Sequence, residues 1–183
     1  MTPYYKTELG TLYHGDCCEV LPQIGHFDLL FTDIPFGVGL AYAEYDDSKK
    51  VEIYAAECEK WFSAFVGVAD LYIVKVPTKN LYVVLPLFVK YLPYIWTVIQ
   101  FSPNAMTHGP FNLSLYTQYL IAGKPWKRPN TDVFKNTRNN LRTDHPAEMP
   151  MAPVEKLFEM FGVDKTKTVV DPCLGSGTTA EAC

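Results

Sequence analysis

Short apolar runs alternate along the chain with segments whose apolar residues recur at helical spacing. We expect strands at residues 9–14, 27–31, 71–76, 94–101, 115–122 and 168–170, and the continuous apolar run at 27–31 is typical of a buried parallel strand. Helical spacing predicts helices over residues 18–24, 51–69, 82–91 and 153–161. The helix over 51–69 is expected to bury Ile53, Ala56, Trp61, Phe65 and Val68. Strands that alternate with helices in this way indicate a doubly wound α/β fold with a mostly parallel sheet.

Length and charge narrow the class of protein. With 183 residues, of which 48% are hydrophobic, the chain can bury the core of one domain spanning residues 1–183. Its net charge of −4 argues against binding nucleic acid through an overall basic field. Residues 123–144 run against this balance, with six cations and two acids. This basic insert either contacts phosphates or is a solvated loop, and the sequence favours neither.

Cysteine usage and the apolar runs bear on the compartment. The five cysteines form no C-x-x-C pair, so we expect neither a disulfide framework nor a zinc site, and we place the chain in a reducing cytoplasm. The first residues lack the pattern of a signal peptide. The longest apolar stretches are interrupted by Pro86 and are too short to span a bilayer. We therefore expect no metal and no membrane partner.

A glycine turn near the end of the chain has the most specific pattern. The apolar strand that ends at Val170 would place Asp171 at its carboxyl end, and Gly175 and Gly177 allow the backbone to turn tightly beside a ligand. A helix beginning at Thr178 would direct its free amides into the same crevice. This order of parts builds a pocket for a small adenosyl ligand. The alternative is a plain helix-entry loop, because a lone G-x-G is weak evidence.

A second candidate follows the apolar run at 27–31. Asp33 would lie at the carboxyl end of a parallel strand, where it faces the ligand crevice, and Phe36 offers a flat surface for stacking. Together with the backbone carbonyl of Ile34, and with Pro35 restricting the backbone, these residues could hold a planar amino group. The alternative is a strand-terminating turn in which Asp33 is only a cap. Taken alone, the residues do not separate the two interpretations.

Two further segments carry polar side chains at element ends. Asp16 could accept a hydrogen bond from an exocyclic amine or merely cap the following helix, and capping is the commoner role. His145 and Pro146 precede the helix at 153–161 and are typical of a stiff helix-entry loop. Without partner ligands nearby in sequence, His145 is not expected to bind a metal.

In this order, the segments resemble the permuted beta class of DNA amino-methyltransferases, which modify adenine N6 or cytosine N4. In that class a catalytic D/N/S-P-P-Y/F motif precedes a cofactor-binding F-x-G-x-G turn, as Asp33 to Phe36 precede Gly175 and Gly177 here. The resemblance covers nearly the whole chain. It implies a Rossmann-like sheet of the S-adenosylmethionine-dependent methyltransferase type, with double-stranded DNA as partner and S-adenosylmethionine as cofactor, and it leaves a homodimer open.

The resemblance also implies a role for each motif. The catalytic set would be Asp33, Ile34, Pro35 and Phe36, which hold and stack on a base flipped out of the duplex. The residues implied to bind S-adenosylmethionine are Asp16, Cys17, His145, Pro146, Asp171, Cys173, Gly175, Gly177, Thr178 and Thr179. The residues implied to contact DNA are Lys127, Arg128, Lys135, Arg138 and Arg142 of the basic insert. An aspartate in the catalytic motif favours adenine N6, since cytosine-N4 enzymes often have serine there.

The chain departs from the family pattern at several positions. Ile34 replaces the first proline of the catalytic motif, so we expect that motif to be less rigid. Met149 stands where lysine is frequent, and Cys173 where phenylalanine is frequent. In the family, a further strand after the glycine turn ends in an acidic residue that binds the cofactor ribose. Because the chain ends at Cys183, we expect a C-terminally truncated member that lacks this strand and binds cofactor more weakly.

Three functions stay open at this stage. The first is a site-specific adenine-N6, alternatively cytosine-N4, methyltransferase of the restriction-modification type in a bacterial, archaeal or phage-infected cell. The second is a catalytically impaired remnant that acts at most as a binding module. The third is an unrelated α/β nucleotide enzyme that shares only the glycine turn, and it predicts that Asp33 and Gly177 lie far apart.

Overall fold

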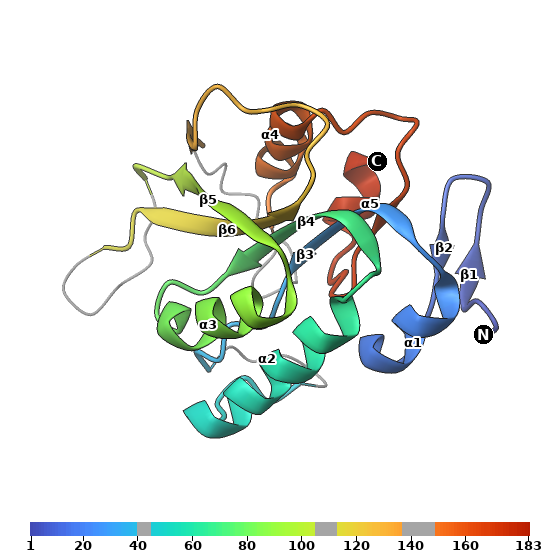
Figure 1. Cartoon of the computed structure of the whole chain (residues 1–183), viewed down its shortest axis with the longest axis horizontal. Helices are drawn as coiled ribbons and strands as arrows, with labels where there is room; N and C mark the ends of the chain where they lie inside the picture. The colour runs from blue at the N-terminus through green and yellow to red at the C-terminus, as the bar shows by residue number, and fades with distance from the viewer. Residues whose placement is uncertain (40–44, 105–112, 137–148) are drawn as a thin grey trace.

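The computed structural model describes residues 1–39, 45–104, 113–136 and 149–183, and Figure 1 shows a central sheet between two helical layers. The strands of the sheet lie in the order β7-β5-β6-β4-β3-β8. Their bounds are β3 Phe27–Asp33, β4 Ala69–Val76, β5 Tyr94–Phe101, β6 Tyr116–Gly123, β7 Val133–Lys135 and β8 Val169–Val170. The helices are α1 Cys17–Ile24, α2 Val51–Phe65, α3 Leu81–Tyr91, α4 Met151–Phe161 and α5 Thr178–Ala182. In the described part of the chain, no helix is long and apolar enough to cross a membrane.

Strand direction decides where the strand ends gather. β3 pairs in parallel with β4 and β8, and β5 pairs in parallel with β7. β6 is antiparallel to both β4 and β5, so it runs against the other strands and the sheet is mixed. The predicted α/β fold is confirmed, with one main-sheet strand, β6, that is antiparallel to its neighbours. We call the edge where β3, β4 and β8 end the carboxyl edge, and the opposite one the amino edge.

Apolar side chains fill both sides of the sheet because successive strand residues point to opposite faces. Leu30 of β3 packs with Phe62 of α2 in the core that α1, α2 and α3 cover. Its neighbour Phe31 packs on the other face against α4, where its ring meets the ring of Phe158 edge to face at 5.5 Å between centroids. Figure 1 shows α1 to α3 below the sheet and α4 above it. The sheet is therefore a buried layer whose polar groups of interest lie at its ends.

The prediction for α2 needs two corrections. The helix ends at Phe65 rather than at residue 69, because Gly67 adopts a left-handed conformation (φ 73°) and the chain then enters β4. Its buried side chains are Tyr54, Cys58, Phe62 and Phe65. The predicted Ile53 and Ala56 face solvent instead. Apolar residues lie on more than one side of this helix, so their spacing did not identify the buried side.

Two short strand pairings were not foreseen. The predicted strand at 9–14 is reduced to β2 (Thr11–Leu12), which pairs with β1 (Tyr5–Lys6) in an exposed hairpin outside the main sheet. Within the basic insert, β7 pairs with β5 and forms an edge of the sheet. The polar and basic residues around β7 concealed its single buried side chain, Phe134.

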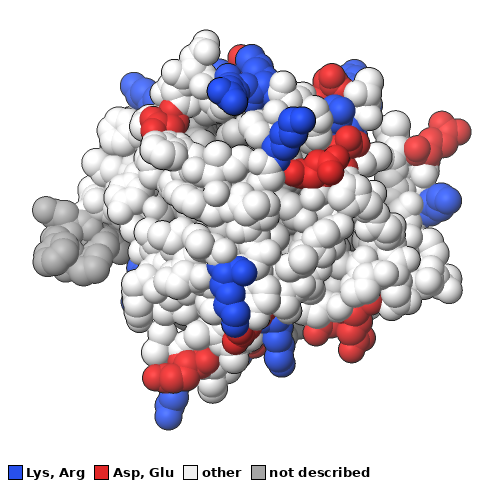
Figure 2. Space-filling view, viewed as in Figure 1, with Lys and Arg blue, Asp and Glu red and all other residues white. Residues whose placement is uncertain are grey.

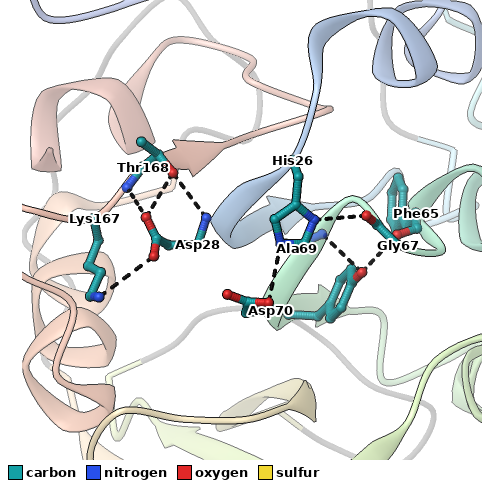
Figure 3. Close-up of polar contacts among 9 residues, drawn as sticks. His26, Asp28, Phe65, Gly67, Ala69, Asp70, Lys167 and Thr168 are labelled. Atoms are coloured by element: carbon teal, nitrogen blue, oxygen red, sulfur yellow. Dashed lines mark hydrogen bonds and ion pairs between the residues drawn. The ribbon is translucent and has the colours of Figure 1, made fainter.

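The two-residue strand β8 is held to β3 at both of its ends. At the amino edge, the carboxylate of Asp28 accepts hydrogen bonds from the backbone N–H (2.8 Å) and the hydroxyl (2.9 Å) of Thr168, with Lys167 at 3.6 Å (Figure 3). These bonds hold the pKa of Asp28 below its ordinary value. At the carboxyl edge, the hydroxyl of Thr32 donates to Asp171 at 2.9 Å. Side-chain bonds thus supplement the few ladder bonds that so short a strand can make.

Gly123 generates the first testable prediction. Its φ is 88°, and a Cβ placed there would lie 2.0 Å from the backbone oxygen of Asp70. Gly67 has a similar φ of 73° but open space around the same position. Gly123→Ala should therefore lower the free energy of unfolding by more than about 3 kcal/mol, because the clash adds to the backbone strain, and Gly67→Ala by about 1 kcal/mol. Urea unfolding measures both, and equal losses would show that the close approach is absent.

Candidate active site

Asp33 ends β3 at the carboxyl edge beside a lysine of the neighbouring strand. The parallel register places Lys75 of β4 opposite Asp33, and the Lys75 Nζ lies 2.5 Å from Asp33 Oδ2. The side chains are only 15% and 21% exposed for Lys75 and Asp33, respectively. The same ammonium lies 5.3 Å from the ring centroid of Phe36, which is partly exposed. The end of β3 is therefore a compact group of a carboxylate, an ammonium and an aromatic ring.

The backbone after Asp33 is anchored by side chains from α2 and from the turn before α3. The hydroxyl of Tyr54 donates to the Pro35 carbonyl at 2.9 Å. The amide of Asn80 donates to the Phe36 carbonyl at 2.8 Å and to the Gly37 carbonyl at 3.1 Å. Tertiary hydrogen bonds thus restrain the backbone after Asp33, where Ile34 stands in place of the first proline of the family motif.

A buried carboxylate restrains the next part of the same loop. Asp47, which is 1% exposed, accepts hydrogen bonds from the backbone N–H groups of Gly37 (2.7 Å), Val38 (2.9 Å) and Gly39 (3.0 Å). Charge-assisted bonds of this kind are stronger than neutral ones. The side chain of Ile34 is also buried, in the core next to Tyr54. The loop is therefore fixed on both its polar and its apolar sides.

Asp171 connects the glycine turn to β3. It accepts hydrogen bonds from the hydroxyl of Thr32 (2.9 Å), the backbone N–H of Cys173 (2.9 Å) and the hydroxyl of Thr179 (2.6 Å). Thr32 is the residue before Asp33, and Thr179 lies two positions after Gly177. Asp33 and the glycine turn therefore share the carboxyl edge, contrary to what an unrelated nucleotide enzyme would predict.

The two threonines after the turn point inward. Thr178 and Thr179 are buried, and the hydroxyl of Thr178 donates to the Met149 carbonyl at 2.9 Å. Their hydroxyls thus stabilise the turn, whereas the predicted ligand contacts of these residues are not tested. Beside Gly177, whose φ is 96°, there is open space where a side chain would otherwise stand. A ligand can approach the backbone closely at this point.

Asp16 and Cys17 lie at the start of α1. The carboxylate of Asp16 accepts a hydrogen bond from the backbone N–H of Cys18 at 2.9 Å, so its capping role is confirmed and its predicted ligand role stays a prediction. The ligand atoms of Asp16, Cys17 and Cys18 lie within 4.8 Å of one another. Burial raises the pKa of the Cys17 thiol to about 12, so the thiol is protonated near neutral pH when no metal is bound. All five cysteines are free.

The thiol of Cys173 is sensitive to groups from three segments. Burial raises the pKa of this thiol well above the ordinary value, and electrostatic interaction with Asp171, Cys17 and Asp33 raises it further. These groups come from the glycine turn, from α1 and from β3. The predicted His145 and Pro146 lie outside the described residues.

The basic insert is divided between the two edges of the sheet. Lys135 ends β7 at the carboxyl edge, which is also the edge where Asp33 lies. Lys127 lies at the amino edge, where its backbone N–H donates to the carbonyl of Phe161 at 3.1 Å. Arg128 lines a hollow of about 680 Å³ there, together with Phe161. Arg138 and Arg142 lie outside the described residues. On the face in Figure 2, charges of both signs are interspersed and much of the surface is uncharged.

Sequence reasoning missed four residues that shape this site, namely Tyr54, Asn80, Asp47 and Lys75. The first three carry no local signal: Tyr54 and Asn80 lie 19 and 44 residues from the carbonyls of Pro35 and Phe36, and Asp47 lies 8 to 10 residues after the N–H groups from which it accepts. Lys75 has one, because it is the charged residue within the otherwise apolar run at 71–76, and lysine is seldom buried without a partner.

The ionisation of Asp171 generates a second testable prediction. Burial raises the pKa of its carboxyl from 3.8 to about 6, although its hydrogen bonds act in the opposite direction. The folded protein therefore favours the neutral carboxyl more than the unfolded chain does. The stability that the neutral carboxyl contributes is fully present below about pH 4 and is lost as the pH rises through about 6. The unfolding free energy of the wild type minus that of Asp171→Asn should fall by roughly 1–3 kcal/mol between pH 4 and 7. Urea titrations at several pH values test this, and a flat or rising difference would contradict it.

Sequence comparison finds relatives over most of the chain. It is 27% identical to the type II methyltransferase M.ScaI of Streptomyces caespitosus over 97% of its own length and 74% of that enzyme. It is 33% identical to the type II methyltransferase M.BamHI of Bacillus amyloliquefaciens over 87 residues, which are 44% of the chain and 21% of that enzyme. No protein-family model matches the chain.

Solved structures show the same fold. The PvuII DNA methyltransferase, which is cytosine-N4-specific, superposes with a TM-score of 0.75 at 16% identity over 98% of this chain and 79% of its own. The complex of M1.HpyAVI with S-adenosylmethionine gives a TM-score of 0.63 at 18% identity, covering 93% of this chain and 86% of its own. Over nearly its whole length the chain is thus similar in sequence to a type II DNA methyltransferase, and it shares the fold of solved DNA methyltransferases.

Proposed function

We propose that the chain transfers a methyl group from S-adenosylmethionine to the exocyclic amine of a base flipped out of double-stranded DNA. One observation carries the proposal: Asp33, Phe36 and the glycine turn meet at one edge of the sheet, linked through the bonds of Asp171 to Thr32 and Thr179. DNA and the cofactor are both available in the cytoplasm, where we expect the protein to act.

The end of β3 would hold the target base. The carboxylate of Asp33 accepts a hydrogen bond from the amine and orients its nitrogen, and the carbonyl of Ile34 is the second acceptor. Phe36 stacks on the ring of the extruded base, which is needed because an amine inside the duplex cannot be approached in line. When bound, S-adenosylmethionine supplies a methyl group already activated by its sulfonium. The amine nitrogen gains a bond to carbon as the carbon–sulfur bond breaks, and one amine proton is lost to Asp33 or water.

The glycine turn would hold the cofactor. The open space beside Gly177 and the left-handed φ values of Gly175 (55°) and Gly177 (96°) are what a backbone cradle for a ligand requires. Asp171 would act by fixing this cradle, since its three hydrogen bonds occupy it within the protein. Asp16 and Cys17 approach from α1 and are proposed to lie near the adenine ring of the cofactor.

The target base is proposed to be adenine, with cytosine as the second candidate. The aspartate at position 33 favours adenine N6, whereas the fold likeness to a cytosine-N4-specific enzyme supports the alternative. Methylation of plasmid DNA lacking both modifications, followed by mass spectrometry of its nucleosides, distinguishes N6-methyladenine from N4-methylcytosine.

Asp33→Ala tests the proposed reaction. Methyl transfer from tritiated S-adenosylmethionine to unmethylated plasmid DNA should fall by at least about 100-fold, because the amine loses its orienting acceptor, while cofactor affinity measured by calorimetry should change less than about threefold. Glu155→Ala, on the exposed side of α4, is the control and should leave both unchanged. Equal loss of transfer and of cofactor binding would show that Asp33 is structural. No heat with wild-type protein at millimolar cofactor would contradict the proposed function itself.

Because Lys135 lies at the carboxyl edge and Lys127 at the amino edge, the two lysines can test at which edge DNA binds. Lys135→Glu, at the carboxyl edge, should weaken binding to a 30-base-pair duplex several-fold and reduce the salt dependence of log K by about one phosphate contact. Lys127→Glu makes the same charge change at the amino edge and should leave affinity within about twofold. Fluorescence anisotropy at 50 and 200 mM NaCl measures both variants, and equal effects would contradict this placement of the duplex.

A further inference from the structure

Lys75 is the cation built into the candidate active site. It lies in register between Asp33 of β3 and Tyr119 of β6, so the three side chains form one row across the sheet. Tyr119 and the residues two positions before Asp33 and Lys75 belong to the core under α4, which places the row on that face. Burial, followed by the charge of Asp33, raises the pKa of Tyr119. Lys75 is therefore positioned by three strands and not by a mobile loop.

Lys75 and Asp33 can form more hydrogen bonds than the one that joins them. An ammonium has three N–H donors, and the bond from Lys75 to Asp33 at 2.5 Å uses one of them. A carboxylate offers about four acceptor positions, so Asp33 can hold Lys75 and a base amine together. With the Nζ 5.3 Å from the Phe36 ring centroid, the donor also lies close to the surface on which the base would stack. The pair thus presents an acceptor and a donor side by side.

We propose that Lys75 donates a hydrogen bond to the ring nitrogen next to the target amine, an inference that rests on the proposed function of this site. In adenine the N6 amine stands beside the acceptor N1, and in cytosine the N4 amine stands beside the acceptor N3. An adjacent carboxylate and ammonium complement this donor–acceptor edge. Lys75 is thereby a specificity-determining residue that touches the substrate.

The same pairing acts differently on the other two bases. Thymine has no exocyclic amine for Asp33. Guanine has the N1–H donor on one side of its amine and the acceptor N3 on the other, so a guanine whose N1 edge faces the pair would place a donor against the ammonium of Lys75. A site built to hydrogen-bond a polar edge discriminates strongly against bases that lack it, because its own groups are then left without partners. Lys75 therefore restricts the substrate class to bases with an amine beside a ring nitrogen acceptor, and it does not separate adenine from cytosine.

The test replaces one atom in the base and one side chain in the protein. Duplexes carry adenine or 1-deazaadenine opposite an abasic site, so that extrusion is easy and N1 is the atom changed. Affinity is measured by fluorescence anisotropy with S-adenosylhomocysteine present, and no turnover is needed. The wild type should bind the adenine duplex roughly 10-fold or more tightly than the deaza duplex, whereas Lys75→Met should bind the two equally. Lys79→Met, an exposed lysine in the loop after β4, should keep the wild-type ratio.

Two results would overturn the role of Lys75. One is a Lys75→Met protein that keeps the wild-type preference for adenine over its deaza analogue, and the other is a wild type that has no such preference. Lys75→Arg keeps a cation beside Asp33 and should retain part of the preference, which separates loss of the contact from damage to the fold. Transfer of tritiated methyl groups to plasmid DNA is measured in parallel. A wild type that discriminates between the duplexes but transfers no methyl group would contradict the proposed reaction and leave the contact of Lys75 supported.

Discussion

The attachment of β8 to β3 is the constraint on which the candidate site depends. A two-residue strand makes few ladder bonds, yet it must align the glycine turn with the end of β3. Two carboxylates accomplish this, Asp28 at one end through Thr168 and Asp171 at the other through Thr32. Asp171 also reaches Thr179, so strand, turn and following helix are joined through one half-buried carboxyl group. Without this junction, the base-binding and cofactor-binding segments of the proposed enzyme would have no fixed relation.

The segment Asp33–Phe36, which has a single proline, illustrates how a backbone can be restrained by other means. Proline restricts the backbone through its own ring, whereas here the restriction comes from hydrogen bonds that the side chains of Tyr54, Asn80 and Asp47 make to the backbone at residues 35–39. The buried side chain of Ile34 adds apolar packing at the same position. We expected this segment to be less rigid because Ile34 leaves its backbone freer than proline would. The tertiary contacts reduce that freedom.

The local sequence pattern was sufficient to predict much of the fold but only part of the candidate site. The strand at 94–101 and the helix at 82–91 were predicted to within a residue, because their apolar runs are long and their neighbours are turn-forming residues. The short β7 was missed, since a strand with one buried side chain has no periodicity to detect. The motifs Asp33–Phe36 and Gly175–Gly177 could be found because chemistry and order agree along the chain. The side chains that hold the first motif could not be found in this way. Lys75 meets Asp33 only through strand register, and Asn80 and Asp47 reach Phe36 and the residues after it only once the loop has closed.

The reversed direction of β6 has a consequence for where the chain tolerates changes in length. Because β5 ends and β6 begins at the carboxyl edge, the connection between them leaves and re-enters the sheet at the edge where Asp33 lies. The connection after Lys135 starts at that edge as well, and it returns at Met149, whose carbonyl meets Thr178. Because loop length itself costs little conformational entropy, either connection can change in length while every strand keeps its register. Changes in length can therefore accumulate at this edge without disturbing the strands that position Asp33.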